Sequence, residues 1–131
     1  MATLSDTAMP KSATRKRTFT HGHRQRLDRA VTQYLEDCYR AKTVARTSEF
    51  AELAKLHRSY LSRTATAILG CSLLAYFRKK QLEEAERLLL TTPLSVEEIA
   101  LRAGFGTPLT LYRCFKKAYG TSPGRFRMVT K

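Results

Sequence analysis

The sequence predicts an all-α fold in which a long linker helix joins two helix-turn-helix subdomains. Three observations support this prediction: apolar residues recur at three- and four-residue spacing, a pattern of two short helices occurs twice, and a stretch without Gly or Pro lies between the copies. No run has the apolar–polar alternation that a half-buried strand needs. At 131 residues the chain has the size of one globular unit, so we expect no separate small-molecule domain.

The charge of the chain indicates a polyanionic partner. There are 24 Lys and Arg against 11 Asp and Glu, a formal net charge of +13. Because so large a charge repels itself, it is easiest to understand in a protein that binds a polyanion. Basic residues concentrate in residues 10–30 and 107–131, whereas nearly all carboxylates lie between them. This distribution of charge predicts that the two ends form electrostatic contact surfaces and that the middle is a solvated scaffold.

Several other classes of protein find no support in the sequence. No apolar run approaches the roughly 18 residues that cross a bilayer, and the N-terminus has no apolar signal core. Cys38, Cys71 and Cys114 are far apart, which fits reduced cytoplasmic thiols. His21-Gly22-His23 has no partners at metal-ligand spacing, and no catalytic motif is present. We expect a cytoplasmic, nucleoid-associated protein that is not an enzyme and has no metal, cofactor or membrane contact.

Residues 1–23 predict a disordered basic arm, because they are rich in Ser, Thr and basic residues and lack apolar periodicity. Three roles for the arm stay open: it follows a nucleic-acid backbone, enters a minor groove or only aids solubility. From residue 24 the apolar spacing of one helix face begins. Its members are Leu27, Val31, Tyr34, Leu35 and Cys38.

An internal repeat relates residues 51–72, in a first subdomain of residues 24–72, to residues 100–122, in a second subdomain of residues 92–131. The matched positions are Ala51 with Ala100, Leu56 with Phe105, Leu61 with Leu111, and Gly70 with Gly120. The offset is 49 as far as Phe105 and 50 from Leu111 onward, so the second copy has one extra residue in its turn. In each copy a short helix ends near Lys55 or Gly104, and a second helix runs to a Gly that suits a left-handed C-cap. This is the helix-turn-helix pattern, with small Ala where the helices cross.

Capping residues fall where the repeat places helix starts. Ser95 and Glu98 have the spacing of a capping box, with the Ser oxygen on the N3 amide and the Glu reaching back. Thr107-Pro108 is an N-cap followed by Pro at the first helical position, and Ser122-Pro123 repeats it. Ser72 occupies the same place in the first copy.

Residues 73–91 predict one continuous helix between the copies. Oppositely charged residues stand four apart, at Lys79 and Glu83, Lys80 and Glu84, and Glu83 and Arg87. A helix of this length spans roughly 28 Å, whereas successive major-groove faces on one side of B-DNA lie roughly 34–36 Å apart. Such a spacer can hold two recognition helices one DNA turn apart within a single chain.

The two expected recognition helices, residues 58–69 and 108–119, each have an inward and an outward face. The inward positions are Leu61, Thr64, Ala65 and Ile68 in the first, and Leu111, Cys114, Phe115 and Ala118 in the second. The outward positions are Ser59, Ser62, Arg63 and Thr66, and Leu109, Tyr112, Arg113 and Lys116. Arg63 and Arg113 occupy the same repeat position, and an Arg there can donate to guanine O6 and N7. The alternative is that each is a solvated surface Arg.

A second group of residues is suited to phosphate contacts, which position a protein on DNA without reading sequence. For each lysine among them, a solvated face is an equally good explanation. Helix N-termini also offer backbone amides to phosphate. The phosphate candidates are Arg58, Lys79, Lys80, Arg102, Thr107, Pro108, Lys116 and Lys117.

Residues 30–127 resemble the DNA-binding domain of the AraC/XylS family of bacterial transcription regulators. The motifs that carry the resemblance are Ile99-Ala100 followed by Gly104-Phe105, then Arg113-Cys-Phe-Lys-Lys117, Gly120-Thr-Ser-Pro123 and Phe126-Arg127. The first copy, from Phe50 to Gly70, matches more loosely.

The resemblance implies a homeodomain-like fold of about seven helices, with both units in adjacent major grooves of an asymmetric double-stranded DNA site. It implies base contacts from Ser59, Ser62, Arg63, Leu109, Tyr112 and Arg113, with Pro108 also at a family contact position. It further implies a monomer that contacts RNA polymerase, as activators of the family do. The chain resembles the short stand-alone members, or a fragment of a longer regulator.

Three residues depart from the family pattern. Ala65 stands where an aromatic is usual, so the first core is expected to lose roughly 3–5 kcal/mol unless neighbours fill the space. His57 replaces a capping Ser, which predicts a weaker helix start. Pro108 and Leu109 replace polar side chains, so they can contact a thymine methyl group but cannot hydrogen-bond to a base edge.

Two alternatives to a sequence-specific regulator stay open. One is a protein-interaction module that binds RNA polymerase or another regulator. The other is charge-driven, non-specific binding of nucleic acid, RNA included.

Overall fold

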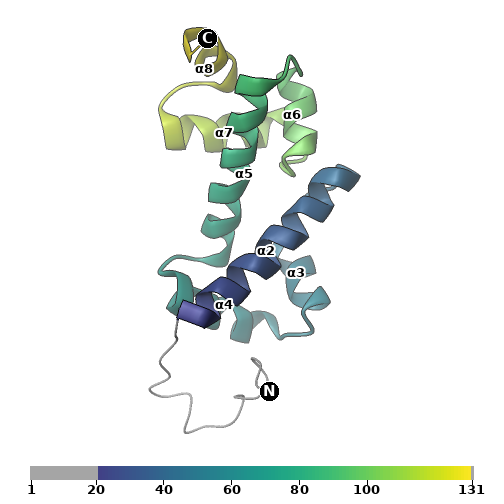
Figure 1. The fold of residues 1–131 in the computed structure, drawn as a ribbon, viewed down its shortest axis with the longest axis vertical. Coiled ribbons are helices and arrows are strands. Elements are labelled where there is room, and N and C mark those ends of the chain that lie inside the picture. The colour runs from purple at the N-terminus through teal and green to yellow at the C-terminus, as the bar shows by residue number, and fades with distance from the viewer. Residues whose placement is uncertain (1–20, 131) are drawn as a thin grey trace, which may run out of the picture.

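The structure, a computed structural model, describes residues 21–130 (Figure 1). Over this range it contains α-helices and no strand, which confirms the predicted all-α fold. The helices are α2 (His21–Ala41), α3 (Thr47–Leu53), α4 (Arg58–Leu69), α5 (Leu73–Thr91), α6 (Val96–Arg102), α7 (Pro108–Tyr119) and α8 (Pro123–Thr130). None of these helices is long and apolar enough to cross a membrane.

The predicted basic arm lies outside the described residues, except for its last three. Residues 21–23 belong to α2, so the prediction of disorder is wrong for them. The first turns of α2 are held by contacts distant in sequence, which no local pattern reveals. The Arg24 guanidinium donates to the carbonyl of Ile68 at 3.2 Å, and Leu27 packs against the first core.

Two hydrophobic cores share the long helix α5. The first lies among α2, α3, α4 and the first half of α5, where Tyr34, Phe50 and Phe77 form an aromatic cluster with ring centroids 5.5–5.8 Å apart. The second lies among the other half of α5, α6, α7 and α8, where the Phe115 ring meets Phe126 edge-on at 5.1 Å. Because α5 is buried in both cores, it fixes the two units relative to each other.

The capping residues act largely as predicted. Ser72, Ser95 and Thr107 each accept a hydrogen bond from the backbone N–H three residues on, at 3.0–3.2 Å. Gly70 and Gly120 end α4 and α7 in the left-handed conformation, at φ 80° and 78°.

The second half of the predicted capping box is wrong. The Glu98 carboxylate accepts instead from Lys42 at 2.9 Å and from Arg102 at 2.8 Å. A charged partner offers a carboxylate a stronger hydrogen bond than a neutral backbone N–H does.

Two further predictions along the helices need correction. On α5, Lys80 pairs with Asp28 of α2 at 2.9 Å, and Arg87 pairs with Glu84 at 2.8 Å, rather than with the residues four positions away. On α7, Ala118 is exposed rather than buried. Tyr119 continues the packing of that helix instead, because its ring lies 4.3 Å from that of Phe115.

The loop between α2 and α3 docks onto the turn between α6 and α7. The Ala45 N–H donates to the Gly104 carbonyl at 3.1 Å. The Val44 side chain lies so close to the backbone of Gly106 that a Cβ on Gly106 would lie 2.7 Å from Cγ2 of Val44. This contact explains why glycine is needed in the Gly-Phe-Gly turn, and it braces the second unit against the first.

Candidate nucleic-acid interface

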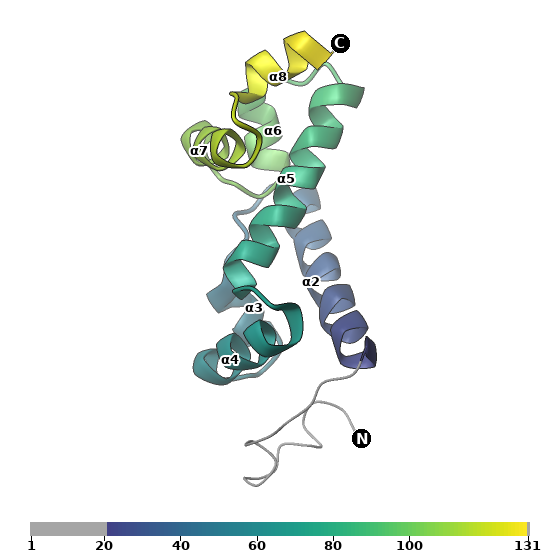
Figure 2. The same ribbon diagram turned by 90° about the vertical axis from the view of Figure 1, so that its left-hand side faces the viewer.

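The two recognition helices lie on one side of α5. Figure 2 shows α4 and α7 on the same side of this helix and α2 on the other. Each follows a tight turn after a short helix, α3 or α6, and each buries its Leu at the matched repeat position, Leu61 or Leu111. Their outward faces therefore point away from the cores and are available to one extended ligand.

The outward face of α4 borders a shallow groove of about 860 Å³. Its lining includes the three base-contact candidates Ser59, Ser62 and Arg63, all exposed, together with Arg58 and Leu74. Polar and cationic side chains thus line the groove at the start of the helix, where backbone N–H groups give a positive potential.

His57 caps α4 by itself, contrary to the expectation of a weakened helix start. Its Nδ1 accepts a hydrogen bond from the Ser59 N–H at 3.1 Å. A neutral imidazole nitrogen with a free lone pair can thus replace the usual hydroxyl oxygen. With His57 in place of the Ser that is usual in the family, the Ser59 N–H at the helix start still has a hydrogen-bond acceptor.

The outward face of α7 combines apolar and cationic groups. Leu109 is 55% exposed and Tyr112 is 42% exposed, and Arg113 is exposed beside them. A half-exposed Leu at the start of a recognition helix has no core to fill, which favours a contact with an apolar group such as a thymine methyl. Thr107 holds the helix start through the Thr110 N–H.

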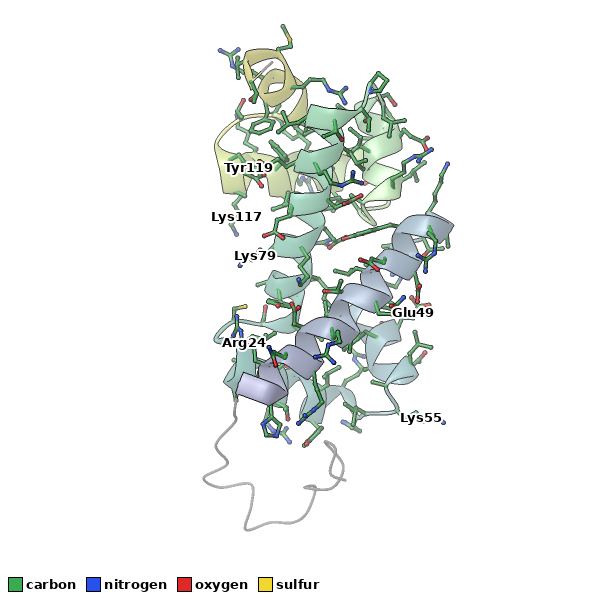
Figure 3. The ribbon with its side chains drawn as sticks, viewed as in Figure 1. Arg24, Glu49, Lys55, Lys79, Lys117 and Tyr119 are labelled. Atoms are coloured by element: carbon green, nitrogen blue, oxygen red, sulfur yellow. The ribbon has the colours of Figure 1, made fainter. Side chains whose placement is uncertain are left out.

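The phosphate candidates divide into two groups. Lys79 of α5 and Lys117 of α7 project from the same edge of the molecule (Figure 3), and both are exposed. Lys80 is only partly exposed, pairs with Asp28 and lies 5.3 Å above the Tyr76 ring. Arg102 is held by Glu98. The other candidates, Arg58, Thr107, Pro108 and Lys116, are exposed.

Arg127 holds α8 in place, although its position among the basic residues 107–131 suggested only an electrostatic contact surface. Its guanidinium donates to the carbonyls of Leu89, Thr92 and Leu94 at 2.7–3.0 Å. These bonds tie α8 to the end of α5 and the loop that follows. The aromatic-Arg pair Phe126-Arg127 is the signal that could have identified this role, because its aromatic partner packs into the second core.

Two carboxylates balance the positive charge inside the scaffold. The Tyr76 hydroxyl and Lys80 hold the pKa of Asp28 below its ordinary value. Lys42 and Arg102 do the same for Glu98. Both stay ionised near neutral pH, away from the outward faces of α4 and α7. Among residues 21–130 no group of three or more His, Cys, Asp and Glu side chains is placed to hold a metal.

Two three-helix units with exposed recognition helices on one side of a shared spacer define a bipartite helix-turn-helix protein. Comparison with known proteins gives the same class. A family described as "Helix-turn-helix domain" matches residues 50–128. The chain belongs to the helix-turn-helix family of AraC/XylS-type regulators, and it is a sequence-specific DNA-binding transcription regulator.

Three relatives illustrate the similarity. The chain is 31% identical over 97 residues to "Probable transcription factor PqrA" of Proteus vulgaris, across 74% of this chain and 80% of PqrA. It is 31% identical over 99 residues to the arabinose operon regulatory protein of Escherichia coli K12, across 76% of this chain but 34% of that protein. The DNA-binding domain of AdpA, solved with a target DNA, superposes with a TM-score of 0.70 at 28% identity, across 79% and 90% of the two chains.

Proposed function

We propose that this protein binds double-stranded DNA as a monomer, with α4 and α7 in two successive major-groove faces of an asymmetric site. The observation that carries the proposal is the placement of both recognition helices on one side of a 19-residue spacer. The spacer helix is roughly 28 Å long, and successive major-groove faces lie roughly 34–36 Å apart. The two lengths are compatible when α4 and α7 extend from the two ends of the spacer. The AdpA domain, a relative of the same fold, was solved on DNA.

In this proposal Arg63 and Arg113 donate to guanines, one in each half-site, and Ser59, Ser62 and Tyr112 contact neighbouring base edges. Leu109 packs on a thymine methyl. Phosphates are contacted by Arg58, Lys79, Lys116 and Lys117, and by the start of α7 at Thr107 and Pro108. Lys80 serves chiefly to neutralise Asp28, so its substitution should affect stability more than DNA affinity.

The family resemblance extends the proposal to RNA polymerase, whose contact on the bound promoter would make the protein an activator. A location in the cytoplasm, on the nucleoid, follows from the proposed target. Transcription in vitro from a promoter carrying the selected site tests the activator role. Occupancy of the site without any rise in transcript would contradict it.

The test of DNA recognition is selection of bound duplexes from a random library at near-physiological salt, so that phosphate attraction alone does not dominate. We expect an asymmetric motif with two short halves about one helical turn apart. Arg63→Ala and Arg113→Ala should each cost about 1–3 kcal/mol on the cognate site and relax the sequence of one half. Arg40→Ala, at an exposed position on α2, removes the same charge and is the matched control.

Other outcomes point to the two alternatives. An equal loss on every duplex would favour charge-driven, non-specific binding. Unchanged DNA affinity in both variants, together with retained binding of a protein partner, would favour an interaction module.

A further inference from the structure

An apolar side chain stands in the wall of the groove that borders the recognition face of α4. Leu74 of α5 is 50% exposed, and it lines this groove together with the base-contact candidates Ser59, Ser62 and Arg63. Within the described residues it belongs to neither hydrophobic core. A single exposed Leu is common on protein surfaces, so its significance depends on where it lies.

The internal repeat shows that folding does not need an apolar side chain at this position. Ser72 and Ser122 each accept a hydrogen bond from the backbone N–H three residues on, at 3.0 and 3.2 Å, at the starts of α5 and α8. Leu74 and Gly124 are the second helical residues after these equivalent caps. A Cβ added to Gly124 would meet nothing within 4 Å beyond its own chain neighbours. The second unit therefore forms the same helix start with no side chain here at all.

Leu74 lies on the face of α5 that leads toward the second recognition unit. Arg78 is one turn further along the same face, and its guanidinium lies 5.5 Å above the ring of Phe105, in the turn before α7. Because α5 runs from α4 toward α7 (Figure 2), the row from Leu74 to Arg78 leads from the first groove toward the second recognition helix. DNA that spans both recognition helices would pass over this row.

The charge of the groove fits a nucleic-acid strand. Arg58 and Arg63 line the groove and are exposed, and its lining, all within the described range, includes no Asp or Glu. Cationic side chains attract phosphates, whereas Leu74 offers an apolar surface. The apolar groups that a DNA strand exposes beside its phosphates are the CH groups of the deoxyribose. Contacts with the sugar, like those with phosphate, carry no sequence information directly.

We propose that Leu74 is a DNA contact that packs against a deoxyribose of the strand bordering the first half-site. This inference rests on the proposed binding mode, in which α4 occupies a major groove. Burial of the exposed part of a Leu side chain adds to affinity without pairing a charge. The contact therefore strengthens binding whatever the bases, and it releases no counterion. The second unit lacks it, because Gly124 stands at the equivalent position.

The test measures the affinity of the full chain for its selected duplex over a range of salt concentrations. Leu74→Ala should weaken binding about three- to tenfold. The factor should be the same on duplexes with single base changes in the first half-site, and the slope of log K against log salt should stay unchanged. Arg58→Ala, in the same groove, should instead reduce that slope by about 1.

The matched control is Leu53→Ala. It makes the same change at a Leu that is 67% exposed but does not line the groove, so DNA affinity should stay unchanged.

Two further variants separate a DNA contact from an effect on folding. Leu74→Met keeps an apolar side chain of similar volume and should retain affinity within about twofold. Gly124→Leu places the apolar side chain at the equivalent position of the second unit and should strengthen binding about threefold. Damage to folding cannot produce such a gain. Thermal melting establishes that each variant is folded.

Four results would overturn the proposal: parental affinity in Leu74→Ala, a loss in that variant that depends on one base, a changed salt slope, and no gain in Gly124→Leu. Failure of the proposed function looks different. A loss in Arg63→Ala together with none in Leu74→Ala would overturn this inference alone. Unchanged affinity in Arg63→Ala would contradict the proposed binding mode itself.

Discussion

The side-chain amide of Gln81 donates to the backbone carbonyl of Ala103 at 3.1 Å. Gln81 is fully buried in the middle of α5, and its amide oxygen accepts from Arg78 at 3.1 Å. The Arg78 guanidinium lies 5.5 Å above the Phe105 ring. One buried amide therefore connects the spacer helix to the turn before α7, next to the contact of Ala45 with Gly104.

Replacing Gln81 by Leu should destabilise the protein by about 1–3 kcal/mol, because the Ala103 carbonyl and Arg78 lose their partner. Chemical denaturation measures the free energy of unfolding. Gln33→Leu removes an amide of the same size from the exposed face of α2 and should change stability by no more than about 0.5 kcal/mol. Equal effects of the two substitutions would contradict the role given to Gln81.

Gly106→Ala should be more damaging than Gly70→Ala. Both glycines have positive φ, 88° and 80°, so each substitution carries the backbone cost of about 1 kcal/mol. At Gly106 the new Cβ also meets Val44 at 2.7 Å, whereas at Gly70 nothing lies within 4 Å. Adding Val44→Ala to Gly106→Ala should recover the steric part of the loss. A double-mutant cycle without coupling would show that the two loops are not in close contact.

Arg127→Met should cost about 2–3 kcal/mol, since it leaves three partly buried carbonyls without their donor. Arg125→Met removes an exposed charge from the same helix and is the matched control. Denaturation gives the size of the effect, and hydrogen exchange should localise it to α8 and the end of α5. A loss of DNA affinity with unchanged stability would instead make Arg127 a DNA contact.

Asp28→Asn should destabilise the protein at neutral pH, and the difference from the parent should disappear in acid. The Tyr76 hydroxyl and Lys80 hold the folded pKa of Asp28 below its ordinary value of 3.8. Its stabilisation is therefore complete above the unfolded pKa and is lost as the pH falls through the folded pKa. Melting temperatures of both proteins, measured from neutral pH to below pH 3.8, give the comparison. A constant difference across this range would exclude Asp28 as the titrating group.

Local patterns predicted the helices well because caps and apolar spacing act within a few residues. Gly70 and Gly120 end helices as expected, and Ser72, Ser95 and Thr107 cap them. Some errors were local, such as Arg87, which pairs with Glu84 three residues away on the same helix, and others came from contacts between distant segments.

The distant partners are ones that sequence spacing does not reveal. Lys80 pairs with Asp28 on α2 rather than with Glu84 on its own helix, and Glu98 pairs with Lys42 rather than with the backbone of its own N-cap. Gln81 gave no signal, because a single Gln in a polar stretch does not indicate that it is buried. The outward side chains of the candidate site were predictable from helix periodicity, whereas the brace between the units was not.

The brace at Val44, Ala45 and Gly106 has a consequence for the genome on which this protein acts. On the proposed binding mode, one base pair inserted between the half-sites turns the second half by roughly 34–36° about the DNA axis. It also moves that half by about 3.4 Å. Two helices locked on a stiff frame cannot follow both changes. Operators for this protein should therefore diverge by base substitution and not by insertion or deletion, and a search for them should hold the spacing constant while allowing each half to vary.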